Sequence, residues 1–247
     1  MRRTLLVIGL ILSAISAHAG LNPNQALKLA ADAVAGGGGG GTPTLVQSSC
    51  TVGSITDPIS LTLASAFTAG NTSVFKVVSS GEALDATGGS DNKSNTYTQY
   101  PTGGFGDAAA RGAFYISTSV PTGGASFTAT INAAGTGSTM SGCLEEWSGV
   151  TMVKTSSRTT ATSVNVNTGT ATFTGASALA LGLMTFSTGG TITITPINGE
   201  TQVGEIENNS AFQAFNAVYK ILGATPESMR WTAGSSIAWK AGMVILQ

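Results

Sequence analysis

Apolar and hydroxyl-bearing residues alternate with a period of two in one short segment after another from Thr44 onward. Ile59, Leu61 and Leu63, for example, alternate with Ser60 and Thr62. The same alternation recurs over residues 127–131, 164–166 and 191–195. Successive side chains of a strand point to opposite faces, so this pattern predicts strands with one buried and one solvated face.

Other segments are largely apolar on both strand faces, namely residues 74–78, 178–186 and 239–246, which predicts central strands covered on both faces. Glycine-rich clusters between the segments predict turns. Residues 211–222 fit a helix as well as a strand, and we prefer a strand over Phe215–Leu222. We therefore expect an all-β fold, a single antiparallel β-sandwich over residues 44–247.

Charged residues are scarce in this chain. They make up 9% of the sequence, with a net charge of −1, whereas hydrophobic residues make up 42%. Such a chain has too few cations to bind nucleic acid, and its apolar content argues against disorder. Low charge also removes one defence against association between sheet edges, so self-association is one expected property.

The first residues have the features of a secretory signal peptide. Arg2 and Arg3 precede an apolar run over residues 4–16, and Ala17-His18-Ala19 is a small-x-small cleavage site. The run is too short for a stable membrane span, although an N-terminal anchor is the alternative. We expect a signal peptide over residues 1–19 and a secreted, extracellular or cell-surface protein, with the periplasm as the other location.

Residues 20–43 are expected to form a short helical arm and a linker. Asn22-Pro23-Asn24 can start a helix, and residues 36–41 are an uninterrupted glycine run. A disordered leader is the alternative reading. If the arm is a helix, it could dock on another subunit or surface without belonging to the β domain.

Cleavage after Ala19 would remove His18, the single histidine of the chain. Without imidazole the protein cannot build a Ser-His-Asp or Cys-His nucleophile or the usual histidine-containing zinc site. We therefore expect no enzyme, no metal centre and no cofactor. A glycoside hydrolase that uses carboxylates alone is a remaining alternative, with Glu205 and Glu207 on one strand face. Glu145 and Glu146 are adjacent and should point to opposite faces.

The two cysteines, Cys50 and Cys143, are expected to form one disulfide because the chain carries an export signal and an even cysteine count. Two free buried thiols and an intermolecular bridge are the alternatives. Three tryptophans fall in or beside predicted strands and are expected in the core: Trp147, Trp231 and Trp239.

Two groups of residues between positions 84 and 105 are candidates for ligand binding. Asp85, Asp91, Asn92 and Asn95 supply oxygen atoms on a glycine-rich loop, which could hold calcium, although such residues also form turns for local reasons.

The second group is aromatic and consists of Tyr97, Tyr100 and Phe105. Aromatic faces beside amides and carboxylates are a common way to hold a sugar. The alternative is that Tyr97 belongs to the core and the other two pack a loop.

Several segments are similar to known sequence motifs. Residues 91–97 are similar to a D-x-x-G-N-T-Y turn, with Ser94 where glycine is common. Residues 145–150 are similar to x-E-Y-S-G-V, with Trp147 for tyrosine. Further matches are residues 67–72, 114–124 and 231–241. Together these segments resemble a diffuse family of jelly-roll-like β-sandwich domains in secreted and surface proteins of bacteria. The resemblance covers about residues 45–247 and implies a fold and an extracellular setting, with no assigned chemistry.

These observations lead to two main hypotheses. The first is a secreted, non-enzymatic module that binds an extracellular glycan or surface component, as in adhesion. The second is a structural subunit of an extracellular or envelope assembly. A concave aromatic groove over residues 85–105 would favour the first, and a long unpaired edge strand would favour the second.

Overall fold

A computed structural model describes residues 41–247, apart from 52–54, 108, 136–137, 174–176, 187–191, 207–213 and 224–225. The expected signal peptide over 1–19 and nearly all of the expected arm and linker over 20–43 lie outside the described residues.

The described residues form fifteen strands and no helix, which confirms the all-β prediction. The strands are β1 (Thr44–Cys50), β2 (Ile55–Thr56), β3 (Ile59–Thr62), β4 (Thr72–Ser80), β5 (Leu84–Asp91), β6 (Thr98–Asp107), β7 (Ala110–Ser117), β8 (Thr128–Ala133), β9 (Thr139–Ser148), β10 (Val153–Asn167), β11 (Ala178–Phe186), β12 (Ile194–Pro196), β13 (Thr201–Ile206), β14 (Ala214–Leu222) and β15 (Arg230–Leu246).

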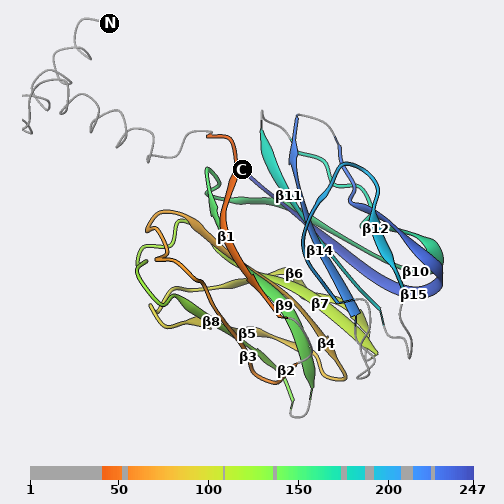
Figure 1. The fold of residues 1–247 in the computed structure, drawn as a ribbon, viewed down its shortest axis with the longest axis horizontal. Coiled ribbons are helices and arrows are strands. Elements are labelled where there is room, and N and C mark those ends of the chain that lie inside the picture. Colours follow the sequence, from red (N-terminus) through yellow and green to blue (C-terminus); the bar gives the residue numbers. More distant parts are fainter. Residues whose placement is uncertain are drawn as a thin grey trace, which may run out of the picture. The chain divides into compact units, whose positions relative to one another are not determined.

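The strands pair into three antiparallel sheets (Figure 1). The inner sheet has the order β1-β9-β4-β7-β6, with β2 also paired to β9. The C-terminal sheet has the order β10-β15-β11-β14-β13, with β12 also paired to β15. The small sheet has the order β3-β8-β5.

The inner sheet is the middle layer of the fold, because its two faces contribute to two different apolar clusters. Phe75 and Val77 of β4 pack with Ile131 of the small sheet. Val74 and Val78, on the opposite face of the same strand, pack with residues of the C-terminal sheet such as those of β11 and β15. The predicted antiparallel sandwich is confirmed, and a third layer covers the inner sheet.

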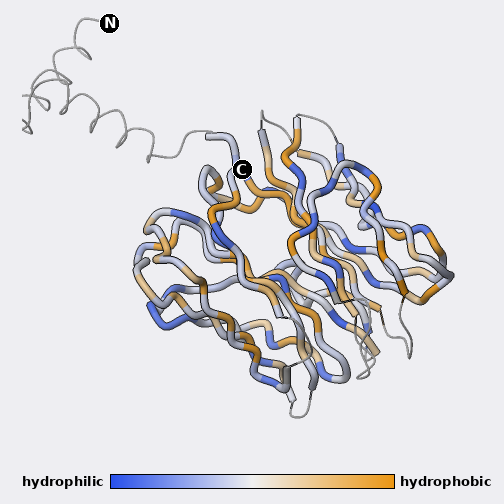
Figure 2. The backbone as a smooth tube through the Cα atoms, in the orientation of Figure 1, coloured by the Kyte–Doolittle hydropathy of each residue, from blue (hydrophilic) through white to orange (hydrophobic). Residues whose placement is uncertain are grey.

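A third apolar cluster lies on the far face of the C-terminal sheet and includes Trp231, Trp239 and Met184. All nine residues of β11 are buried, as expected for residues 178–186. Trp147, Trp231 and Trp239 are at most 1% exposed, which confirms their core placement. In the ambiguous segment, Ala214–Leu222 form the strand β14, as preferred for Phe215–Leu222. Figure 2 shows the hydrophobic residues gathered along the strands of these layers.

Candidate functional site

The loop between β5 and β6 is held together by its own polar side chains. Asp91 Oδ1 accepts hydrogen bonds from the backbone N–H groups of Lys93 (2.8 Å) and Asn95 (3.1 Å). Its Oδ2 accepts from Asn95 Nδ2 at 2.9 Å. Asn95 is 6% exposed and is also hydrogen-bonded to the backbone of Thr122 through both ends of its amide. These bonds fix the turn and tie it to the next loop.

The two other predicted oxygen ligands also bond to groups within the fold. Asn92 donates to the carbonyl of Ser126 and accepts from the backbone N–H of Thr128. Asp85 Oδ1 accepts from both the N–H and the hydroxyl of Thr87. The described residues hold no group of three or more His, Cys, Asp or Glu side chains placed to bind a metal ion. Hydrogen bonds that hold the fold therefore account for these side chains, and a calcium site stays a prediction.

Ser94 occupies the position where the resembling motif carries glycine, and its φ is 63°. A left-handed backbone costs a non-glycine residue roughly 1–2 kcal/mol. Ser94→Gly should therefore stabilise the fold by about 0.5–1 kcal/mol after the extra chain entropy of glycine is subtracted. Urea denaturation measures this change. The same substitution at Ser90, in β5, is the control and should not stabilise the protein. If the Ser94→Gly protein is no more stable than wild type, the left-handed backbone at Ser94 does not cost the fold free energy.

The three predicted aromatic residues do not share an exposed face. Tyr97 is 7% exposed and packs between the inner and small sheets. Phe105 is 4% exposed and packs between the inner and C-terminal sheets, where its ring lies against Gly112 and Gly242. Tyr100 is half-buried against the same cluster as Phe105. The structure places these side chains as packing on two sides of the inner sheet.

Two buried tyrosines have phenol groups that are costly to ionise. Tyr97 Oη lies 2.8 Å from Ser73 Oγ. Tyr115 donates to the backbone carbonyl of Asp85 and accepts from Gln99 Nε2 at 2.9 Å. Burial raises the pKa of both phenols far above the usual value near 10, because the charged phenolate would be removed from water.

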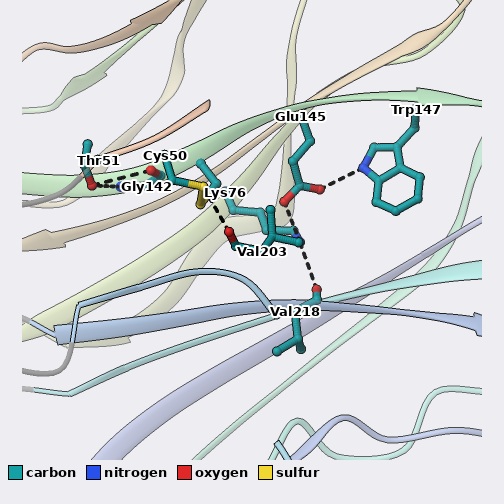
Figure 3. Close-up of a disulfide and its surroundings, with 9 residues drawn as sticks. Cys50, Thr51, Lys76, Gly142, Glu145, Trp147, Val203 and Val218 are labelled. Atoms are coloured by element: carbon teal, nitrogen blue, oxygen red, sulfur yellow. Dashed lines mark hydrogen bonds and ion pairs between the residues drawn. A yellow bond between two sulfur atoms is a disulfide. The ribbon is translucent and has the colours of Figure 1, made fainter. Parts of the chain in front are cut away.

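A buried ion pair lies between the inner and C-terminal sheets (Figure 3). Lys76 Nζ is 2.7 Å from Glu145 Oε1 and donates to the carbonyl of Val218 in β14 at 2.8 Å. Trp147 Nε1 donates to Glu145 Oε2 at 2.7 Å. Both charged side chains are 0% exposed. Burial lowers the pKa of Lys76, and the nearby carboxylate opposes that shift.

This ion pair was not predicted from the sequence. The available signal was Lys76, the one charged residue among the apolar residues of the segment 74–78. Glu146 faces the other way and accepts hydrogen bonds from Gln47, Asn71 and the backbone of Thr68. The prediction that the adjacent glutamates point to opposite faces is therefore confirmed.

Cys50 and Cys143 form the predicted disulfide (Figure 3). It joins β1 to β9, where the two cysteines are direct partners in the register. Gly204 of β13 packs directly on the bond, since a Cβ there would lie 2.3 Å from Cys143 Sγ. The described part of the chain holds no free cysteine. A disulfide indicates a non-reducing environment.

The carboxylate pair suggested for a hydrolase is only partly described. Glu205 accepts hydrogen bonds from Gln202 (2.8 Å) and Asn216 (2.7 Å). Glu207 lies outside the described residues. No helix among the described residues has the length and hydropathy of a membrane span.

The longest strand at a sheet edge is β10, with 15 residues, and within the C-terminal sheet it pairs with β15 alone. Figure 1 shows it beside β15 at the periphery of the fold. Its charged residues, Lys154 and Arg158, lie in its first six positions. Residues 159–167 carry no charge and no proline, and consist mainly of threonine, asparagine and valine.

A surface hollow of about 420 Å³ lies where the far end of β10, the start of β15 and the end of β12 meet. We call it the β15 hollow. Its lining residues are Asn165, Asn167, Thr170, Ile197, Ser228 and Arg230, over the buried Val166 and Trp231.

Comparison of this chain with models of protein families, with curated proteins and with solved structures finds no match.

Proposed function

We propose that this protein is a secreted, non-enzymatic structural subunit of an extracellular or envelope assembly. The observation that carries the proposal is the edge strand β10. Sheet edges in monomeric proteins are usually short, charged, interrupted by proline or covered. Residues 159–163 of β10 carry no charge and no proline, and the register with β15 is uninterrupted from Thr155 to Ser163.

The other sheet edges are better protected. The edge strand β6 of the inner sheet contains Pro101 and a register shift between Tyr100 and Phe105. The edge strands β1, β3, β5 and β13 have seven, four, eight and six residues. Of the described edges, β10 therefore offers the longest row of backbone groups for pairing with a second copy.

The low charge and the disulfide support the same proposal. A net charge of −1 gives little repulsion between copies. The disulfide fits an extracellular setting. The glycan-binding hypothesis, by contrast, depended on an aromatic surface over residues 85–105, and two of its three aromatic side chains are buried.

The full chain should form concentration-dependent oligomers, seen by light scattering and electron microscopy. Ala161→Lys places a charge in the exposed middle of β10 and should shift the protein to monomer, because a lysine on an edge strand opposes pairing with another strand. Ala69→Lys makes the same change on an exposed loop and should leave association intact. A wild-type protein that stays monomeric at its solubility limit would refute the proposal.

A further inference from the structure

The β15 hollow is built on a part of the sheet where three strands lie side by side. Val166 of β10, Trp231 of β15 and Pro196 of β12 are register partners. Val166 and Trp231 belong to the core cluster, so the neighbouring residues in each strand point to the outer face. The outer row contains Asn167, Arg230 and Ile197, whose backbone N–H donates to the Arg230 carbonyl.

Arg230 is exposed and its guanidinium is held in place without being neutralised. Its Nε donates to Ser228 Oγ at 3.1 Å. Among the described residues no carboxylate lies within ion-pair distance of this guanidinium. The nearby carboxylates serve other donors: Glu200 accepts from the backbone N–H groups of Asn198 and Arg230, and Glu227 pairs with Lys220. The terminal nitrogens of Arg230 are therefore available to a ligand.

The side chains around Arg230 offer hydrogen-bond donors and acceptors. The Asn165 amide and the Thr170 hydroxyl are exposed and make no hydrogen bond within the described residues. Asn167 uses its Oδ1 to accept from Gly169 N–H, which leaves its Nδ2 free to donate. Ile197 is 52% exposed and adds one apolar wall. This combination suits a ligand with several hydroxyl groups, one apolar face and a negative charge.

The hollow offers side chains and not a free edge of β15, because β15 is paired with β10 on one side and with β12 on the other at residues 231–232. The side chains that line the hollow therefore supply the ligand contacts. The planar guanidinium of Arg230 matches a carboxylate in a two-bond geometry.

We propose that the β15 hollow binds an acidic saccharide, with Arg230 holding the carboxylate of a uronic acid unit and Asn165, Asn167 and Thr170 contacting its hydroxyl groups. The hollow has room for one or two sugar units, since ligand sites of this kind measure some hundreds of Å³. The site lies at the end of β10 and does not include residues 159–163, so it does not depend on the self-association proposed above.

Calorimetry on the full chain tests the site with trigalacturonate, the neutral cellotriose and tri-glutamate. Trigalacturonate should bind and cellotriose should bind at least about tenfold more weakly, because cellotriose has no carboxylate to pair with the Arg230 guanidinium. Arg230→Gln should weaken trigalacturonate binding at least about tenfold. Lys154→Gln removes the same charge at the other end of β10 and should change the affinity less than about twofold.

Asn165→Ala is the second variant, and it should weaken binding about two- to tenfold because the Asn165 amide has no hydrogen-bond partner among the described residues and is open to a ligand. Four results would each overturn the proposal: no binding of trigalacturonate by folded protein, equal binding of cellotriose, tighter binding of tri-glutamate, or unchanged affinity in both Arg230→Gln and Asn165→Ala. The same titration with the Ala161→Lys protein shows whether the site works when self-association is blocked, so the two proposals can fail separately.

Discussion

Replacing Lys76 by methionine should lower the free energy of unfolding by about 3–5 kcal/mol. The substitution keeps the length of the side chain but removes the ammonium group that lies 2.7 Å from Glu145 Oε1. Glu145 would then be a fully buried carboxylate without its cation, since its side chain is 0% exposed. The hydrogen bond from Trp147 Nε1 would be left to offset the hydration that this carboxylate loses on folding. The carbonyl of Val218 would lose its donor as well. Urea denaturation measures the loss.

The double variant Lys76→Met/Glu145→Gln separates the ion pair from simple packing. Glutamine keeps an acceptor for Trp147 Nε1 while it removes the buried charge, so the double variant should be more stable than Lys76→Met alone. Lys154→Met, on the exposed part of β10, is the matched control and should change stability by less than about 0.5 kcal/mol. A double variant as unstable as the single one would mean that the cost comes from packing and not from an isolated charge.

The strands could be predicted because a two-residue period reports which face of each strand is buried. Ile59 and Leu61 of β3 show it directly, since both are buried while Ser60 and Thr62 pair their hydroxyls with Thr130 and Thr128 on the outside. The disulfide could be predicted from cysteine number and export alone. The alternation of apolar and polar residues identifies the buried face of a strand but not the sheet that packs against it. The third layer could therefore not be predicted.

The candidate site was harder to predict because the same residue types form turns and ligand sites. Asp91 and Asn95 are as suited to bonding each other as to holding an ion, and only their partners decide between the two. The burial of Phe105 was not predicted from the sequence; its ring packs against Gly112 of β7 and Gly242 of β15. Arg230 could not be predicted as a site residue. Its position beside Asn167 and Ile197 depends on the register of three strands that are far apart in sequence.

Stability should fall steeply above pH 10. The pKa values of Tyr97 and Tyr115 are raised by burial, so the folded protein keeps both phenol protons while the unfolded chain loses them as pH passes 10. The folded state then binds more protons than the unfolded state, and the free energy of unfolding falls with pH by about 1.4 kcal/mol per unit for each group. The two tyrosines together would cost about 5 kcal/mol at pH 12, which is comparable to the whole stability of many domains.

Lys76 does not mask this effect above pH 10.5. Its pKa is lowered in the folded state, so its contribution to stability rises with pH up to the unfolded value of 10.5 and is constant above it. Urea denaturation at a series of pH values between about 9 and 12 measures how the free energy of unfolding changes with pH. This range spans the ordinary tyrosine pKa of about 10. Tyr97→Phe and Tyr115→Phe should each remove about half of the slope above pH 10, because each removes one phenol that ionises only on unfolding. If neither variant flattens the slope, the alkaline loss of stability originates elsewhere and the two phenols ionise within the folded protein.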